Sequence, residues 1–364
     1  MPPPARLDIM RTGIEARSKN RYRAPTRQQE LLLKATLLQG SAAGIARHQW
    51  RLHIDPERLD YDSQRLLPHL CATLLAHGIS TPEMGRLKGA YRRTWYENTV
   101  RLHAAARLLR GLRIAGVETM LLKGAALTLR YYRDCGLRPM NDLDILVPTH
   151  QAGAAIEALK ALGLAPMRVR LSEAQALRFG HAYPYRDAGG REVDLHWHLF
   201  YQRVAPRADA AYWAAADSVT LHGESTRILD PADQLLHVCV HGTQVAWWSP
   251  ERAPSLRWVA DAMMILTDTA QELDWDRFFE QARRLRFVLP VQESLGYLGD
   301  ALDAPIPADA MMRLRRTRAS FGERVAHRWG HVPLWQLPLA AAFRVRRTIR
   351  GPWRAAGRPA RKGP

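Results

Sequence analysis

The sequence is poor in the features that mark secreted, disulfide-bonded and membrane-spanning proteins. Its 364 residues include only three cysteines, Cys71, Cys135 and Cys239, which lie far apart and form no CxxC pair. This spacing argues against a disulfide framework or a cysteine-based zinc site and fits a reducing compartment. No run approaches the roughly 18 consecutive apolar residues that a membrane span needs, and the first residues contain no apolar signal core. We therefore expect a cytoplasmic protein without a transmembrane segment.

Acidic residues are also scarce. Lysine and arginine total 53 against 35 aspartates and glutamates, so the formal net charge is +18. The segment 344–364 carries eight basic residues and no acidic one. Such a tail can bind nucleic acid, an anionic membrane surface or an acidic partner. Its one aromatic residue is Trp353, so base stacking is not indicated, and we favour a solvated extension over nucleic-acid binding.

Length and periodicity predict a mixed α+β (or α/β) protein with a small mixed sheet between two all-α regions. Apolar residues at helical spacing indicate helices on both sides of a central segment that alternates as strands do. The expected regions are a disordered N-terminus (1–25), an N-terminal helical region (26–113), a mixed α/β core (114–204), a C-terminal helical region (205–340) and a basic tail (341–364).

The central segment begins with a strand, a helix and a second strand. Met120–Leu122 is a short apolar run, and Ala125–Arg133 favours helix until Gly136 and Pro139 interrupt it. The chain then enters Asp142–Val147, a mostly apolar strand with two aspartates near its start.

These two aspartates, Asp142 and Asp144, are two residues apart and therefore point to the same face of the strand. Carboxylates this close repel each other unless a positive charge lies between them. Oxygen ligands of this kind suit Mg²⁺ or Mn²⁺. The pattern predicts a divalent metal site.

Upstream, Lys123, Gly124 and Ala125 connect the first strand to the helix. A glycine at such a junction lets a phosphate approach the backbone, and a helix N-terminus offers free N–H groups. A phosphate cradle followed by Asp-x-Asp is typical of a nucleoside triphosphate site.

A hairpin is predicted downstream, with arms His181–Arg186 and Glu192–His198. In the second arm, Asp194, His196 and His198 alternate with apolar residues and define one polar face. We favour Asp194 as a third metal ligand and include His196 as a supporting residue, whereas an exposed sheet face explains His198 better.

Three other residues, His237, His241 and Cys135, are of types that can bind zinc or act as nucleophiles. His237 and His241 lie one helical turn apart, but no HExxH signature accompanies them, so a core or capping role is favoured over zinc binding. Cys135, alone in its loop, is explained as an incidental residue more readily than as a nucleophile.

Three motifs together resemble the uncharacterised bacterial nucleotidyltransferases of the polymerase-β-like superfamily. They are Lys123-Gly124-Ala125, the segment from Arg138 through Asp142-Leu-Asp144-Ile-Leu-Val147, and Val193-Asp194-Leu-His196-Trp197. The layout is similar as well, since helices follow from a Leu-Leu-His-x3-His segment and from Trp258-Val-Ala-Asp261. The resemblance covers roughly residues 30–300.

The resemblance implies that Asp142, Asp144 and Asp194 hold two metal ions, Mg²⁺ or Mn²⁺, with Asp194 also able to act as a general base. A nucleoside triphosphate, ATP by default, would donate its monophosphate to a hydroxyl group of an unknown small-molecule, peptide or protein acceptor. Gly124 and the backbone at Ala125 would cradle phosphates, and Lys123 or Arg138 would neutralise charge on the pyrophosphate.

One departure from the superfamily is that Ala125 stands where a serine is usual, so no hydroxyl is offered to a phosphate there. An alternative function is therefore a catalytically idle nucleotide-binding or antitoxin-like regulatory protein. Transfer to RNA, anchored by the basic tail, is a third interpretation, and it would show a steep dependence on salt.

Overall fold

The computed structural model describes residues 25–53, 58–167, 171–205, 207–243, 256–269 and 272–329. The chain forms two compact units, residues 1–318 and 319–364. Of the second unit, the described residues comprise α15 (Phe321–Trp329) and the two residues before it. The expected disordered N-terminus up to residue 24 and the basic tail 341–364 lie outside the described residues. The division of the chain into five regions stays a prediction.

The described part of the first unit begins with helices, as expected. They are α1 (Arg27–Leu37), α2 (Gly40–His53), α3 (Tyr61–Gln64), α4 (Leu67–Ala76) and α5 (Met84–Ile114). Thr26 caps α1 in a capping box with Gln29. None of the described helices combines the length and the apolar character required to cross a membrane.

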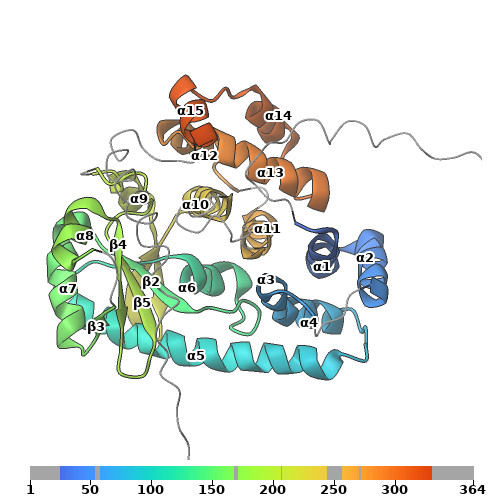
Figure 1. Cartoon of the computed structure of the whole chain (residues 1–364), viewed down its shortest axis with the longest axis horizontal. Helices are drawn as coiled ribbons and strands as arrows, with labels where there is room; N and C mark the ends of the chain where they lie inside the picture. The colour runs from blue at the N-terminus through green and yellow to red at the C-terminus, as the bar shows by residue number, and fades with distance from the viewer. Residues whose placement is uncertain are drawn as a thin grey trace, which may run out of the picture. The chain divides into compact units, whose positions relative to one another are not determined.

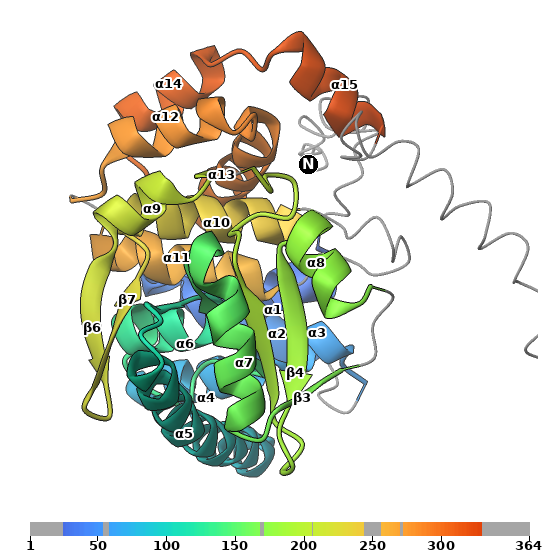
Figure 2. The same ribbon diagram turned by 90° about the vertical axis from the view of Figure 1, so that its left-hand side faces the viewer.

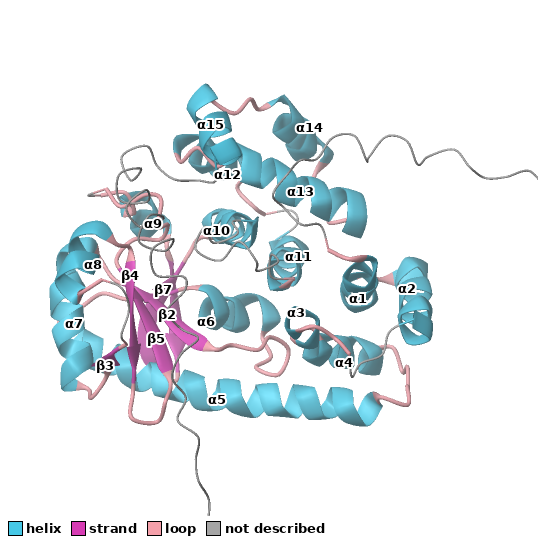
Figure 3. Cartoon of the chain, in the orientation of Figure 1, coloured by secondary structure: helices cyan, strands magenta, loops and turns pink. Residues whose placement is uncertain are grey.

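Seven strands form one mixed sheet in the order β3-β4-β5-β2-β1-β7-β6. The strands are β1 (Met120–Leu121), β2 (Asp142–Leu146), β3 (Ala165–Pro166), β4 (Ala182–Arg186), β5 (Glu192–His196), β6 (Asp217–Leu221) and β7 (Glu224–Ile228). Figure 3 shows the sheet with helices on both sides. The predicted fold class, a mixed sheet flanked by helices, is confirmed.

Strand β2 is central because it pairs parallel with β5 and antiparallel with β1. The register places Asp144 opposite Asp194. The predicted hairpin is present: β4 and β5 pair antiparallel, and Asp187 accepts backbone hydrogen bonds that close its turn. Residues opposite each other in paired strands point to the same side of a sheet, so the carboxylates of β2 and β5 share one face.

The other face of β2 and β5 is apolar. Its side chains include Leu143, Ile145, Val193 and Leu195, which join one hydrophobic cluster with residues of α5 and α7 (Ala152–Ala161). In Figure 2, α7 lies across this face of the sheet, and in Figure 1 the long helix α5 runs along the base of the unit. Burial of this face therefore fixes which way the alternating aspartates point.

The remaining helices of the first unit follow the hairpin or connect the strands. They are α6 (Lys123–Leu127), α8 (Glu173–Phe179), α9 (Ala210–Ala215), α10 (Pro231–Thr243), α11 (Arg257–Thr269), α12 (Trp275–Arg284), α13 (Val288–Leu302) and α14 (Ala308–Arg316). A second, larger hydrophobic cluster unites α1, α4 and α10 to α14 with Met120, Leu122 and Leu146 of the sheet's carboxylate face.

Two features differ from the sequence-based expectation. The segment after residue 205, expected to be helical, contributes β6 and β7, and β7 pairs parallel with β1. These strands, DSVTL and ESTRI, are five residues long and mostly polar, so the period-two alternation that predicts a strand is weak in them. The helix expected over Ala125–Arg133 is α6 followed by a π-helical turn, η1 (Thr128–Tyr132), and it ends at Arg133 in the left-handed region (φ 55°), before Gly136.

The loop between η1 and β2 is held by one buried side chain of α5. Asn98 is fully buried, and its Nδ2 donates to the carbonyl oxygens of Cys135 (2.7 Å) and Arg138 (2.8 Å). Its Oδ1 accepts from the backbone N–H of Met140 at 3.3 Å. Three backbone groups of a loop with no strand partner are thereby satisfied, which positions the start of β2.

We predict that Asn98→Ala destabilises the protein by about 2–4 kcal/mol, because it leaves these backbone groups buried without partners. Asn141→Ala is the matched control: Asn141 belongs to the same loop but is exposed, and it donates to the Tyr61 hydroxyl at 3.1 Å. Urea denaturation followed by circular dichroism measures both. Equal effects of the two substitutions would contradict the anchoring role of Asn98.

Candidate functional site

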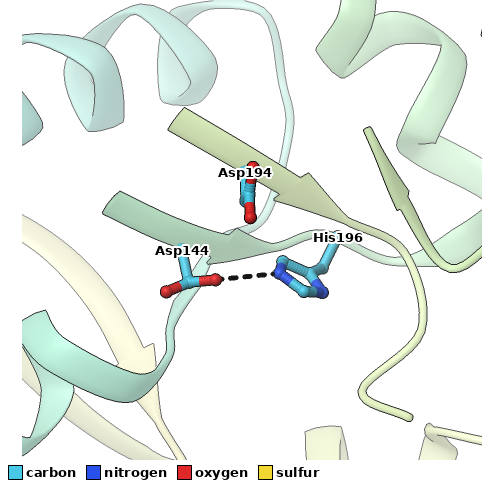
Figure 4. A group of neighbouring side chains, drawn as sticks. All are labelled: Asp144, Asp194 and His196. Atoms are coloured by element: carbon cyan, nitrogen blue, oxygen red, sulfur yellow. Dashed lines mark hydrogen bonds and ion pairs between the residues drawn. The ribbon is translucent and has the colours of Figure 1, made fainter. Parts of the chain in front are cut away.

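The site is built by two neighbouring parallel strands. Asp144 of β2 and Asp194 of β5 are paired in register, and His196 lies two residues beyond Asp194 on the same face. One ligand atom from each of these three residues lies within 4.8 Å of the other two. Figure 4 shows the three side chains pointing toward a common point beside the strands. In the described part of the chain this is the one group of three acidic, histidine or cysteine side chains with such spacing.

Asp144 is the most constrained of the three. It is 2% exposed, and its Oδ1 atom receives two contacts: the ammonium of Lys123 donates to it, and Nε2 of His196 lies 3.0 Å away. Burial opposes a charge on this carboxylate, but Lys123 and His196 outweigh burial and hold the pKa of Asp144 well below its usual range. Asp144 is therefore a buried anion at neutral pH.

The pKa values of Asp142 and Asp194 are shifted in the opposite direction, upward. Burial raises the pKa of Asp194, and the charge of Asp144 raises it further. The pKa of Asp142 is raised for the same two reasons, while Lys123 and Arg257 partly offset the rise. Three carboxylates thus share one face with a local excess of negative charge, a condition that a bound cation would relieve.

The structure places Asp142 beside, but outside, the three-residue group. It starts β2, opposite Glu192 in the register, and it interacts with Asp144 and Lys123 through charge. The sequence grouped Asp142, Asp144 and Asp194 as the metal ligands. The structure brings Asp144 and Asp194 together with His196, and the ligand roles of all four residues stay predictions.

His196 has the properties of a metal ligand or of a hydrogen-bond partner to one. It is 3% exposed, and among the described residues its Nδ1 atom has no hydrogen-bond partner. The His181 ring lies 5.4 Å from the His196 ring. Burial and the neighbouring His196 lower the pKa of His181 well below its usual value, which keeps that ring neutral.

His198 and His237 have partners outside the three-residue group. Nδ1 of His198 lies 2.7 Å from Oδ2 of Asp209, whose other oxygen accepts from the N–H of Leu199 at 3.0 Å. His237 is buried and packs edge-on against Phe200. This packing agrees with the core role expected for His237.

At the strand-to-helix junction, Gly124 serves packing. A Cβ added to Gly124 would lie 2.7 Å from Cγ of Met140 and 2.9 Å from Nη1 of Arg138. Ala125 is buried in the cluster under α5. The Cα of Gly124 therefore faces these side chains, and the phosphate-cradling role expected for Gly124 and Ala125 stays a prediction.

Arg138, expected to neutralise pyrophosphate, binds a carboxylate within the protein. Its Nε and Nη2 donate to the two oxygens of Asp261 on α11 at 2.7 and 2.8 Å, and the Tyr132 hydroxyl donates to Asp261 at 2.9 Å. All three side chains are buried. This bidentate pair ties the loop before β2 to α11, a geometry in which guanidinium and carboxylate match.

Sequence reasoning missed the partners of this network. The partner of Asp261, Arg138, lies 123 residues earlier in the chain. Arg257 was not considered: its Nη1 lies 3.4 Å from the Pro139 carbonyl oxygen, and it favours the charged form of Asp142. Burial, and the nearby Arg138 and Arg65, lower the pKa of Arg257 to about 10.

Comparison with known proteins gives one family and several distant structures. Residues 61–303 match the family described as uncharacterised nucleotidyltransferases. No curated protein matches the chain in sequence. Among solved structures, an antigenic nucleotidyltransferase-like protein from Paracoccidioides brasiliensis is 16% identical over 58% of this chain and 96% of its own, with a TM-score of 0.35.

A second solved structure is that of ANT(2")-Ia in complex with adenylyl-2"-tobramycin. It is 11% identical over 52% of this chain and 98% of its own, with a TM-score of 0.36. The solution structure of ANT(2'')-Ia has a TM-score of 0.35, with 13% identity over 54% of this chain and 95% of its own.

We predict that Asp261→Asn lowers the free energy of unfolding by about 3–5 kcal/mol, because it leaves the buried Arg138 guanidinium without its counter-charge. The control is Asp268→Asn on the same helix. Asp268 pairs with the exposed Arg133 at 2.8 Å, so its loss changes stability by less than about 1 kcal/mol. Chemical denaturation of both variants measures the difference, and a small effect at Asp261 would show that the buried pair does not anchor the loop.

Proposed function

Since the chain belongs to the family of uncharacterised nucleotidyltransferases, we propose that it transfers a nucleoside monophosphate from a nucleoside triphosphate to a hydroxyl group of an acceptor. The observation that supports this most directly is the registered pair Asp144 and Asp194, with His196 two residues farther along β5 on the same face. The acceptor is a small molecule, a peptide or a protein, and ATP is the first donor to test.

The residues of this face fit a divalent cation. Two carboxylates and an imidazole converge within 4.8 Å, a third carboxylate stands beside them, and the buried Nδ1 of His196 has no described partner. Carboxylates suit Mg²⁺ and Mn²⁺, and an imidazole ligand shifts the preference toward Mn²⁺. Asp144, Asp194 and His196 would hold one ion, with Asp142 placed to bind a second. Such ions would neutralise the triphosphate and lower the pKa of the acceptor hydroxyl.

The protein's own groups then have separate tasks. Besides its role as a metal ligand, Asp194 would take the proton of the acceptor hydroxyl, a role that its raised pKa favours. The acceptor oxygen forms a bond to the α-phosphorus while the bond from that phosphorus to the bridging oxygen breaks, and pyrophosphate leaves. Arg138 acts indirectly, because its pairing with Asp261 positions the loop that leads into β2.

One observation favours a second candidate, an idle nucleotide-binding or antitoxin-like regulatory protein. Lys123 already supplies a positive charge to Asp144, so the carboxylates have an internal counter-ion. Ala125 also lacks the hydroxyl that a serine would offer to a phosphate. This candidate predicts nucleotide binding without turnover.

We predict that the purified protein transfers label from one α-labelled nucleoside triphosphate to a component of cell extract in the presence of Mg²⁺ or Mn²⁺. Asp144→Asn and Asp194→Asn each lower the rate at least about 100-fold. Removing a residue that only hydrogen-bonds to a metal ligand already lowers activity by up to about 100-fold, and removing the ligand itself should cost at least as much. Asp142→Asn tests the second ion in the same way. Glu192→Gln is the matched control, since Glu192 lies two residues before Asp194 on β5 and pairs with Arg186 at the surface.

In this assay, binding of nucleotide without label transfer by the unaltered protein would favour the idle candidate. Equal activity of Asp144→Asn and Glu192→Gln would exclude the proposed site. Transfer to RNA would show itself by labelled nucleic acid and by a steep loss of binding with salt.

We further expect chelation by EDTA to abolish label transfer and added Mn²⁺ or Mg²⁺ to restore it, because the three carboxylates then lose and regain their counter-ion. Titration of each metal into the stripped protein, read as the rate of label transfer, checks this. Transfer that persists in excess EDTA would contradict metal dependence while leaving the nucleotidyltransferase activity intact.

A further inference from the structure

Lys123 occupies an unusual place in the backbone. Leu122 separates it from β1, and it begins α6, with φ of 43° in the left-handed region. Residues other than glycine adopt this region at an energetic cost and keep it only where the surrounding structure holds them. From this position the Lys123 ammonium contacts Asp144 of β2.

The ammonium of Lys123 lies among the carboxylates of the site. It donates to Oδ1 of Asp144, and Asp142 and Asp194 also favour its charged form. Burial opposes this charge, yet the carboxylates outweigh burial and raise the pKa of Lys123. The amine is thus a fixed positive charge at neutral pH, held by the same groups that a metal ion would use.

The contact is also specific to one oxygen. Lys123 and Nε2 of His196 both bind Oδ1 of Asp144. In Figure 4 this is the Asp144 oxygen that faces Asp194 and His196. A cation held by Asp144, Asp194 and His196 would use the carboxylate that the Lys123 ammonium now contacts. The ammonium and the metal ion are therefore two positive charges that compete for Asp144.

We propose that Lys123 is a tethered counter-ion of the metal site, which yields Asp144 to a divalent ion and then pairs with the triphosphate of the nucleotide. This inference rests on the proposed function. Its consequence is that metal and nucleotide favour each other's binding, because the nucleotide gives the displaced ammonium a new anionic partner. Such coupling is reciprocal between the two ligands. Lys123 is a binding and positioning residue here, and it takes no part in the bond changes.

The proposal predicts that loss of the Lys123 ammonium raises the affinity for metal and lowers the affinity for nucleotide. An ion pair with only a structural role would not change the two affinities in opposite directions. Removing the ammonium frees Asp144, so Lys123→Met should bind Mn²⁺ alone about tenfold more tightly than the unaltered protein. The same variant should bind α,β-methylene-ATP in saturating Mn²⁺ about tenfold more weakly, because the triphosphate has lost a cation. A variant that is simply destabilised would lose both affinities.

The test uses the full chain freed of metal with EDTA. Electron paramagnetic resonance of free Mn²⁺ measures metal binding, and equilibrium dialysis with the labelled analogue measures nucleotide binding. Lys123→Arg keeps the charge and should keep weak Mn²⁺ binding, and Lys123→Gln provides a second neutral variant should Lys123→Met unfold. Lys160→Met is the matched control, since Lys160 pairs with Glu157 and Glu173 at the surface.

Tighter Mn²⁺ binding with weaker nucleotide binding in both neutral variants supports the proposal. Unchanged or weaker Mn²⁺ binding in these variants overturns it, even where the unaltered protein binds metal and nucleotide, and in that case the proposed function stands. Mn²⁺ binding by the neutral variants alone would support the counter-ion role while contradicting metal-dependent transfer by the unaltered protein. If none of the proteins binds Mn²⁺, both proposals are wrong.

Discussion

Repulsion between buried carboxylates is the constraint on which this structure depends. The parallel pairing of β2 and β5 sets Asp144 directly beside Asp194, with Asp142 on the same face. Burial of the opposite face against α5 and α7 prevents the strands from turning these charges toward solvent. The fold must therefore bring positive charge or hydrogen-bond donors to this face from other elements.

Two groups meet this need. Lys123 comes from the start of α6, and His196 comes from the end of β5, the strand that also carries Asp194. Two outer connections hold the frame: Asn98 binds the loop before β2 from α5, and the buried pair of Arg138 and Asp261 joins that loop to α11. The N-terminal helices and α11 thus act on the site through the loop between them.

This arrangement explains why a nucleotidyltransferase site would keep a lysine among its acids. A carboxylate trio with no counter-ion would shift its pKa values upward and lose the charge that binds metal. The ammonium keeps Asp144 ionised, and the membership of a nucleotidyltransferase family supplies the ligand class that could exchange with it. The contact between Lys123 and Asp144 is compatible with both candidate functions, the enzyme and the idle nucleotide-binding protein.

The sequence alone was sufficient to predict the strands that carry Asp144 and Asp194, because period-two alternation and an Asp-Ala-Gly-Gly turn are local signals. It also placed Asp142 and Asp144 on one face, since that follows from strand geometry. It could not show that Lys123 and Arg138 turn to Asp144 and Asp261, nor that β6 and β7 extend the sheet. Lys123 and Asp144 are 21 residues apart, Arg138 and Asp261 are 123 residues apart, and β7 pairs with a strand about a hundred residues earlier. Contacts over such separations are decided by the packing of the whole unit, because no local pattern in the sequence specifies them.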